Sequence, residues 1–182
     1  MKHPPVLETE RLLLRPFTIE DSGTVQRFAG SDEVYRNTMG MPRPYEEADA
    51  VRWIAGHSVT FYQGEGIELA VTLKSGELIG AAGITISKAH NRGELGYWIG
   101  KPYWNLGYCS EAADVLIRYA FDSMGLNKIT SRHFPHNPAS GRVLEKVGFI
   151  IEGILKEEYS KDGKYLSAIV YALFRDGIRE IR

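Results

Sequence analysis

The sequence predicts a mixed α/β (α+β) fold in which helices cover the faces of one sheet. Two observations predict it: strand-like and helix-like segments alternate along the chain, and no repeat, low-complexity tract or Ser/Gly-rich linker divides them. The chain has 182 residues, which is a typical length for one domain. We therefore expect a single domain over residues 1–182.

The first half of the chain predicts a strand, two helices and a three-stranded meander. Residues 10–17 are rich in Leu and indicate a strand. Thr18 is a candidate N-cap for a helix to about Gly30, because Asp21 follows three residues later. A second helix is expected over residues 45–62, where apolar residues recur near helical spacing. The antiparallel meander is expected over residues 67–73, 78–87 and 94–99.

The second half predicts two helices and three further strands. Residues 110–124 carry apolar side chains at steps of three and four, which predicts a helix with Ser110 as its N-cap. A strand is expected over residues 128–134 and a short helix over 139–147, which Gly148 ends. The last two strands are expected to pair as a hairpin over residues 154–159 and 166–174.

Charge and composition exclude several classes of function. Lys and Arg total 22 against 23 Asp and Glu, a formal net charge of −1, so no positive field invites nucleic acid or an anionic membrane. No apolar run approaches the ~20 residues that span a bilayer, and the start lacks the apolar core of a signal peptide. The single cysteine, Cys109, cannot form an internal disulfide or a multi-cysteine metal cage. We expect a cytoplasmic protein with no metal, nucleic-acid or membrane partner.

The segment 102–112 joins a strand to a helix and is a candidate anion site. The first amides of a helix lack internal partners and lie at the positive end of its dipole, so they can bind a diphosphate. Gly107 lets phosphate oxygens approach the backbone, which a Cβ would prevent. Neither a P-loop nor a dinucleotide fingerprint is present. On this segment alone, a loop glycine followed by the N-cap Ser110 explains the residues equally well.

Further motifs accompany this loop. They are the opening strand 8–16, Gly96-Tyr97-Trp98, the segment Asn137-Pro138-Ala139-Ser140 continuing to Phe149, and the ending 171–176. Together they resemble the GCN5-related N-acetyltransferase (GNAT) superfamily, in the branch of RimJ/RimL-type ribosomal-protein N-terminal acetyltransferases. The resemblance covers nearly the whole chain. It implies the GNAT fold, a mixed, mostly antiparallel sheet of about seven strands with helices on both faces, splayed between residues 94–99 and 128–134.

The resemblance implies that acetyl-CoA is the co-substrate and that its pantetheine arm enters the splayed gap. Two positions depart from the family's loop: Asn105 stands where its first glycine is usual, and Cys109 replaces a small residue. These departures bear on the affinity for the cofactor. The residues that the resemblance assigns to the cofactor are Leu106, Gly107, Tyr108, Cys109 and Ser110 on the pyrophosphate, Trp98 and Ile99 along pantetheine, and Asn137 on the arm.

Direct attack of an amine on acetyl-CoA needs a neutral nucleophile. At pH 7 an α-amine is about one-tenth neutral, whereas a lysine amine is neutral about once in 2,500 molecules, so an α-amine needs a weaker base. Glu94 is the candidate base, acting directly or through a water. It alternates with Gly96 and Trp98 on one strand face, at the end where the resemblance implies the acetyl group. An ion pair between Glu94 and Arg92 is the structural alternative.

The reaction also needs an oxyanion donor and a proton or hydrogen bond for the thiolate. Backbone N–H groups around 96–98 are candidate donors, because an unpaired strand edge has free amides. Ser140 matches the family's Asn-x-x-Ser segment, which implies a hydroxyl near the CoA sulfur; a helix N-cap is the alternative role. Cys109 is expected to provide spacing rather than chemistry. His133 and His136 lack a third metal ligand, which favours packing or substrate contact.

We therefore expect an acetyl-CoA-dependent N-acetyltransferase that uses a ternary complex and accepts a protein or peptide N-terminal α-amine. Acidic residues near the last hairpin, Glu157, Glu158 and Asp162, either attract a cationic amine or form a solvated turn. Two alternatives stay open. The acceptor is a small amine such as an amino acid, polyamine or antibiotic, or the chain is a non-catalytic acyl-CoA binding or sensing domain. A homodimer is compatible with each of these readings.

Overall fold

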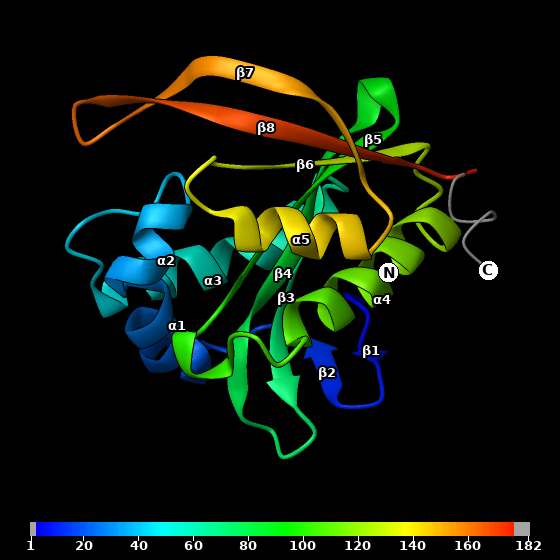
Figure 1. The fold of residues 1–182 in the computed structure, drawn as a ribbon. Helices are drawn as coiled ribbons and strands as arrows, with labels where there is room; N and C mark the ends of the chain where they lie inside the picture. The colour runs from blue at the N-terminus through cyan, green and yellow to red at the C-terminus, as the bar shows by residue number, and fades with distance from the viewer. Residues whose placement is uncertain (1–2, 177–182) are drawn as a thin grey trace.

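The computed structural model describes residues 3–176, which form one eight-stranded sheet with helices on both faces (Figure 1). The remaining ends of the expected domain, 1–2 and 177–182, lie outside the described residues. The strands are β1 (Leu7–Glu8), β2 (Leu12–Arg15), β3 (Gly66–Leu73), β4 (Leu78–Ser87), β5 (Arg92–Ile99), β6 (Lys128–His133), β7 (Ile150–Lys161) and β8 (Lys164–Phe174).

The sheet is mixed and mostly antiparallel, as predicted. Its strand order is β1-β2-β3-β4-β5-β6-β8-β7, and β5–β6 is the parallel pair. This pair is short: Arg92 to Glu94 face Lys128 to Thr130, and no further residues of the two strands are in register. The predicted splay between residues 94–99 and 128–134 is therefore confirmed, and it begins after Glu94.

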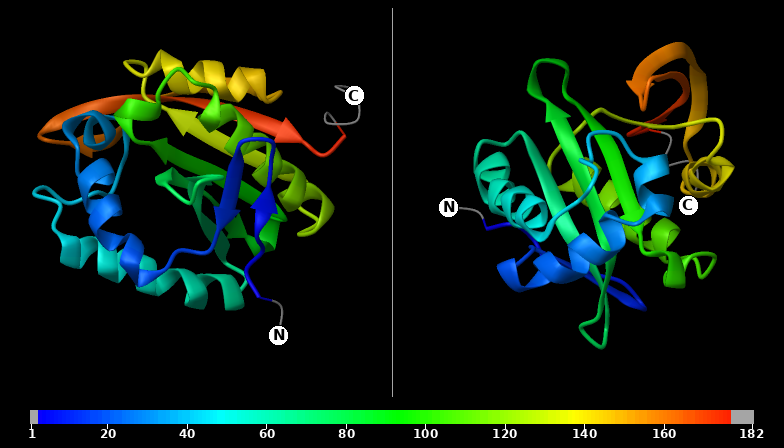
Figure 2. Two further views of the ribbon diagram at one scale, coloured as in Figure 1. Left: turned by 90° about the horizontal axis from the view of Figure 1, so that it is seen from below. Right: turned by 90° about the vertical axis from the view of Figure 1, so that its left-hand side faces the viewer.

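Helices cover both faces of this sheet (Figure 2). α1 and α3 contact β4 and β3 on one face, and α2 follows α1. α4 and α5 contact β5 and β6 on the other face. The helices are α1 (Ser22–Ala29), α2 (Asp32–Asn37), α3 (Glu47–Tyr62), α4 (Tyr108–Asp122) and α5 (Pro138–Lys146).

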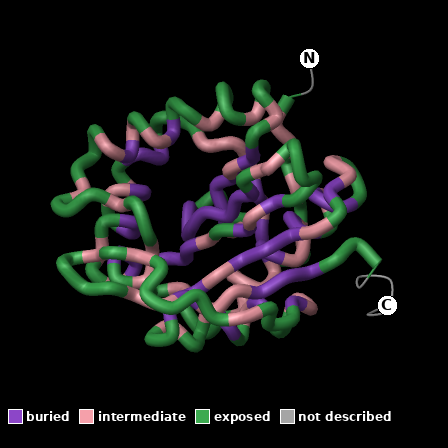
Figure 3. The backbone as a smooth tube through the Cα atoms, turned by 90° about the horizontal axis from the view of Figure 1, so that it is seen from above, coloured by how far each residue is buried: buried purple, intermediate pink, exposed green. Residues whose placement is uncertain are grey.

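The core is divided by the sheet into two clusters, with the buried strands at the centre (Figure 3). Successive side chains of a strand point to opposite faces. Leu95 and Ile99 accordingly pack in the cluster of α4, whereas Trp98 packs with α1 and α3. The two faces of β5 thus lead to two different layers of helices.

The structure adds one strand and one α-helix that the sequence did not predict, β1 and α2. The capping prediction is correct, because the Thr18 amide donates to the Asp21 carboxylate over 2.9 Å. It caps a 3-10 turn over Ile19–Asp21, however, and α1 begins after that turn. The predicted strand 154–159 is longer in the structure, where β7 spans Ile150–Lys161. Register shifts in β7 interrupt the alternation of apolar and polar residues from which the ends of a strand are predicted.

The tip of the β7–β8 hairpin docks on α2, below the hairpin at the left of Figure 1. The Tyr35 hydroxyl donates to the Asp162 carboxylate over 2.7 Å. The Lys161 ammonium donates to the carbonyls of Tyr35 and Thr38. These contacts join α2 to the far end of the sheet. Within the described residues, no helix is long and apolar enough to cross a membrane.

Candidate active site

A cleft of about 650 Å³ lies where β5 and β6 diverge. Its wall includes Tyr97 from one face of β5 and Glu94 and Trp98 from the other, so the cleft reaches both sides of the sheet. On the side of α4 and α5 it is lined by Gly107, Tyr108, Cys109, Ser110, Asn137 and Ser140. On the side of α1 to α3 it is lined by Val34, Asn37, Thr38, Met39, Met41 and Glu68.

The loop before α4 presents the start of that helix to the cleft. Gly107 is the N-cap, with a left-handed φ of 82°, and α4 begins at Tyr108. The prediction that Ser110 caps the helix is wrong, because the left-handed turn at Gly107 starts the helix earlier and leaves Ser110 in its first turn. Asn105, which replaces the usual family glycine, also adopts a positive φ of 61°.

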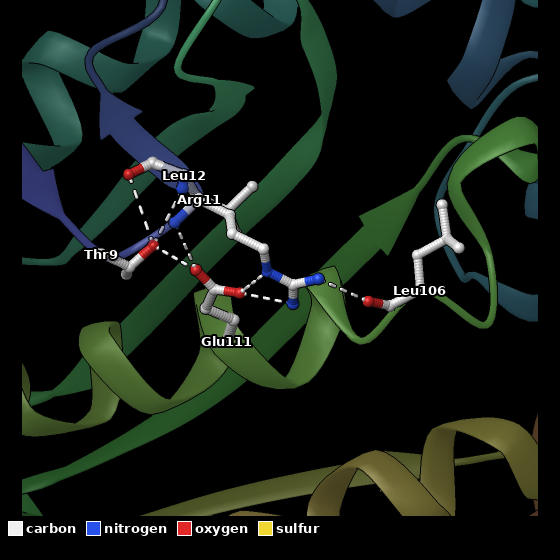
Figure 4. A network of polar contacts seen from close by, with 5 residues as sticks. All are labelled: Thr9, Arg11, Leu12, Leu106 and Glu111. Carbon is white, nitrogen blue, oxygen red and sulfur yellow. Dashed lines mark hydrogen bonds and ion pairs between the residues drawn. The ribbon is translucent and has the colours of Figure 1, made fainter.

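A polar network holds this loop against the start of the chain (Figure 4). The Glu111 carboxylate accepts hydrogen bonds from the Thr9 hydroxyl at 2.5 Å and from the Arg11 Nε at 2.7 Å. Arg11 Nη1 in turn donates to the Leu106 carbonyl at 2.9 Å. Burial alone would raise the pKa of Glu111, but the hydrogen bonds from Thr9 and Arg11 hold it below its ordinary value. The anionic carboxylate thereby fixes Leu106 at the edge of the candidate anion site.

Cys109 lies in the first turn of α4 and faces the cleft. Burial raises the pKa of its thiol to about 12. The thiol is therefore protonated at neutral pH and is a poor nucleophile. This environment agrees with a spacing role for Cys109.

The open edge of β5 offers main-chain groups to the gap. The Leu95 carbonyl accepts from the Ser131 hydroxyl on β6 at 2.9 Å, whereas the Gly100 amide donates to Ile79 beside β4 at 2.8 Å. Because main-chain groups alternate between the two edges of a strand, the amides of Tyr97 and Ile99 face the gap. The expected oxyanion donors were main-chain amides around 96–98. Of these, the Tyr97 amide faces the gap, and the Ile99 amide lies two residues further along the same edge.

Glu94 is the last residue of β5 that pairs with β6. Its Oε2 accepts from Arg132 Nη2 at 2.7 Å, and its side chain is 45% exposed. The alternative of an ion pair between Glu94 and Arg92 is therefore wrong, because the partner of Glu94 is Arg132. Arg132 lies on the adjacent strand, two residues beyond the register partner of Glu94, and that proximity depends on the sheet register. Arg132 Nη1 also donates to the Tyr159 hydroxyl at 2.6 Å.

The opposite wall carries Asn137 and Ser140 at the start of α5. Asn137 is the N-cap, and its side-chain oxygen accepts from the Ser140 amide at 3.4 Å. The alternative role of Ser140 as N-cap is therefore wrong. Its hydroxyl instead lies 3.0 Å from the phenol oxygen of Tyr97. Burial raises the pKa of Tyr97 well above its ordinary value, so this phenol stays protonated.

The two histidines do not converge on a common point. His133 is buried, with Nδ1 2.8 Å from the Phe134 carbonyl, while His136 is exposed with Nε2 3.1 Å from the Arg36 carbonyl. These positions agree with the packing interpretation for His133. Over residues 3–176, no group of three His, Cys, Asp or Glu is placed to hold a metal ion.

Tyr97 and Glu68 are among the cleft-wall residues whose side chains the sequence analysis gave no role. Tyr97 was treated as part of a motif, and its contact with Ser140 joins residues 43 apart in the chain. Glu68 on β3 is half-buried at the cleft, and burial raises the pKa of its carboxyl to about 8. A lone glutamate within the apolar run of a predicted central strand was the available signal.

Comparisons with known proteins agree with the motifs. A family model described as an acetyltransferase (GNAT) domain matches residues 11–150. The chain is 31% identical over 173 residues to the uncharacterized N-acetyltransferase YoaA of Bacillus subtilis, which covers 94% of this chain and 97% of that protein. It is 25% identical over 142 residues to the ribosomal-protein-serine acetyltransferase of Escherichia coli, covering 78% of this chain and 79% of that enzyme.

A solved structure supports the fold. RimL, a ribosomal L7/L12 alpha-N-protein acetyltransferase solved in complex with coenzyme A, superposes with a TM-score of 0.86 at 15% identity. The match covers 95% of this chain and 99% of that chain. At this identity, the likeness extends to the arrangement of strands and helices.

The Glu111 network makes stability depend on pH. A carboxyl with a lowered pKa stabilises the fold above its unfolded pKa, near 4.5, and loses that contribution as the pH falls through the folded value. We expect Glu111→Gln to lower the free energy of unfolding by about 1 to 2 kcal/mol at pH 7. The difference from the wild type should shrink below about pH 4.5.

Denaturant unfolding at pH 7 and pH 3.5 measures this effect. Asp114→Asn is a matched control on the same helix, since Asp114 forms an exposed ion pair with Arg118. It should change stability by roughly 0.5 kcal/mol or less. An equal loss in both variants, or a Glu111→Gln loss that does not depend on pH, would contradict this role.

Proposed function

The chain belongs to the acetyltransferase (GNAT) family, and on that premise we propose that it acetylates a protein or peptide N-terminal α-amine in the cytoplasm, using acetyl-CoA. The observation that carries this proposal is the gap between β5 and β6, which has the start of α4 at one mouth and carboxyl groups at the other. The relative named for ribosomal-protein serine acetylation supports the choice of acceptor.

The α4 side of the cleft fits the diphosphate of acetyl-CoA. In this proposal the amides of Leu106, Gly107, Tyr108, Cys109 and Ser110 surround the phosphates at the positive end of the α4 dipole. A Cβ on Gly107 would lie 3.3 Å from Arg11 Nη2 and would fill space beside these amides. Each hydrogen bond to a charged phosphate contributes about 1.5 to 3 kcal/mol.

The remaining part of the cofactor would follow the open edge of β5. Pantetheine lies along Trp98 and Ile99, and its amides can pair with the free main-chain groups that face the gap. The side chain of Asn137 borders this path, although it also caps α5. The acetyl group then lies near Glu94, where β5 and β6 diverge, and is accessible from both sides of the cleft.

The chemistry proceeds by direct attack of the amine nitrogen on the thioester carbonyl. The Tyr97 amide donates to the developing oxyanion, because it faces the gap without a strand partner. Ser140 donates a hydrogen bond to the departing sulfur. The Tyr97 phenol lies 3.2 Å from the Ser140 carbonyl and 3.0 Å from the Ser140 hydroxyl; when its single proton is donated to the hydroxyl oxygen, the serine proton is free for the sulfur. Glu94, the candidate base of the sequence analysis, faces the acceptor, where its carboxylate also attracts the ammonium form of the amine.

Thiol release in the presence of varied amines tests the proposal. The protein is incubated with labelled acetyl-CoA, with peptides that differ in their N-terminal residue, and with a panel of amino acids, polyamines and aminoglycosides. We expect label on peptide α-amines, because the cleft wall on the α2 side includes the exposed Met39, so a chain end can reach it from solvent. Label on free small amines alone would contradict the proposal that the acceptor is a peptide α-amine. Acetyl-CoA binding without any thiol release would favour a sensing domain.

Gly107→Ala tests the anion site, and Gly125→Ala is its matched control. Both glycines have a positive φ, 82° and 72°, so each alanine should cost about 1 to 2 kcal/mol of stability. Gly125 lies beyond the other end of α4. We expect only Gly107→Ala to weaken CoA binding, by roughly ten- to hundredfold, as one charged hydrogen bond is lost. Calorimetry with CoA measures this, and equal affinities in the two variants would exclude the site.

Ser140→Ala tests the hydrogen bond to the leaving group. We expect kcat for peptide acetylation to fall by roughly ten- to hundredfold, with the Kd of acetyl-CoA within a factor of two or so. Ser58→Ala, an exposed serine on α3, serves as the control and should leave both values unchanged. A Ser140→Ala variant with wild-type kcat would remove Ser140 from the chemistry.

A further inference from the structure

We propose that Glu68, on the face of the sheet away from α4 and α5, is the group that takes the proton from the acceptor amine. The inference rests on the proposed function and adds a catalytic residue to it. Glu68 belongs to β3, two strands away from the gap, so its link to the chemistry comes from the sheet register.

The register places Glu68 in line with the gap. Glu68 pairs with Gly83 on β4, and Gly83 pairs with Gly96 on β5. Paired residues of adjacent strands share a face of the sheet. A Cβ built on Gly83 would overlap the carboxyl of Glu68, so this carboxyl lies across β4 toward β5. A Cβ on Gly96 would meet no atom within 4 Å, so open space continues to the edge of β5.

Gly83 on β4 and Gly96 on β5 are therefore neighbours across the sheet. Because neither has a side chain, they form a trough from Glu68 to the point where β5 and β6 diverge. Glu94 and Trp98 flank Gly96 on the same face of β5 and border this trough. The trough belongs to the cleft described above, on the side opposite the α4 loop. An amine that enters beside α2 would lie over Gly96, between the Glu68 carboxyl and the thioester carbon.

The charges near Glu68 leave it free to exchange a proton. Glu94, at the end of the trough, is paired with Arg132. His57, on the α3 helix that packs against β3, is neutral at pH 7 because burial lowers its pKa to about 4. Over residues 3–176, no hydrogen bond or ion pair compensates the Glu68 carboxyl, and burial alone raises its pKa to about 8.

This proton affinity suits an α-amine. Transfer from an α-ammonium, with a pKa near 7.7 to 8.0, to such a carboxyl is nearly balanced, whereas transfer to an ordinary glutamate is about 3,000-fold unfavourable. Transfer from a lysine, with a pKa near 10.4, remains about 250-fold unfavourable. Proton transfer to Glu94, by contrast, would leave Arg132 without its carboxylate partner. The raised pKa of Glu68 thus makes proton transfer from an N-terminal amine nearly balanced, while the lower pKa of that amine sets its advantage over a lysine side chain.

The proton balance of the reaction follows. The Glu68 carboxylate takes one proton from the ammonium group, and the neutral nitrogen attacks the thioester carbon to form the C–N bond. The C–S bond breaks, the second proton of the nitrogen leaves with the CoA sulfur as a thiol, and the amide keeps the third. Glu68 then returns its proton to water through the open cleft. The net products are the acetylated amine, CoA thiol and one proton.

Glu68→Gln tests this role, with Glu94→Gln as the matched carboxyl control. We expect Glu68→Gln to reduce kcat for a peptide acceptor by about 100-fold or more, with the Kd of acetyl-CoA unchanged. For an acceptor peptide whose amine pKa lies well below 8, kcat of the wild type should still rise with pH near 8, and this rise should disappear in Glu68→Gln. Glu94→Gln should raise KM and keep the rise. Glu68→Gln with near wild-type kcat, or with the same pH profile, would overturn the inference.

Two measurements keep the test independent of folding and of the proposed function. The stability of the wild type relative to Glu68→Gln should fall as pH rises from about 4.5 to 8, because a raised carboxyl pKa destabilises the charged folded form. A stability difference between the two proteins that does not change with pH would show that the Glu68 carboxyl is not in a buried environment, and would overturn the inference. Gly96→Ala, which has room for its methyl group in the free protein, should raise KM for the amine by tenfold or more and preserve CoA binding. Wild-type protein that acetylates no amine would instead refute the proposed function itself.

Discussion

The early end of main-chain pairing between β5 and β6 is the constraint on which the site depends. β6 pairs with β8 along its whole length but with β5 only up to Thr130. Where the strands diverge, the hydroxyls of Thr130 and Ser131 donate to carbonyls of β5 at 3.2 and 2.9 Å. These carbonyls of β5 thus accept hydrogen bonds from side chains of β6. Beyond it, β5 keeps a free edge inside the protein, which costs stability unless a ligand can pair with it.

The two sides of this gap have opposite electrostatic character. On one side, the helix dipole of α4 and its unpaired first amides provide partial positive charge, without a lysine among the residues proposed for the phosphates. On the other side, Glu94 and Glu68 provide carboxyl groups in different states: Glu94 is ion-paired and half-exposed, whereas Glu68 is half-buried and has no compensating partner among the described residues. In the proposed complex, the thioester lies between the amides of α4 on one side and the Glu68 carboxyl, as proton acceptor, on the other.

The sequence was sufficient for features with local signals and insufficient for those that depend on register. The strand Leu78–Ser87 was predicted with its observed ends, because an apolar run stands between two turn segments. The connection from a strand to the helix after residue 107 was also predicted, although the N-cap is Gly107 and not Ser110, because a left-handed φ leaves no trace in the sequence beyond the glycine itself. Arg132 beside Glu94, and Glu68 over Gly83, are cross-strand neighbours that no periodicity reveals.

A crystal structure of the protein with acetyl-CoA tests the central claim most directly. The account predicts diphosphate oxygens within hydrogen-bond distance of the amides at Tyr108 to Ser110, and a pantetheine amide paired with the edge of β5 at Tyr97 or Ile99. The thioester carbon should lie on the Gly96 side of the gap, open toward Glu68. A structure with β5 and β6 closed along their full length, or with the cofactor bound outside the gap, would contradict it.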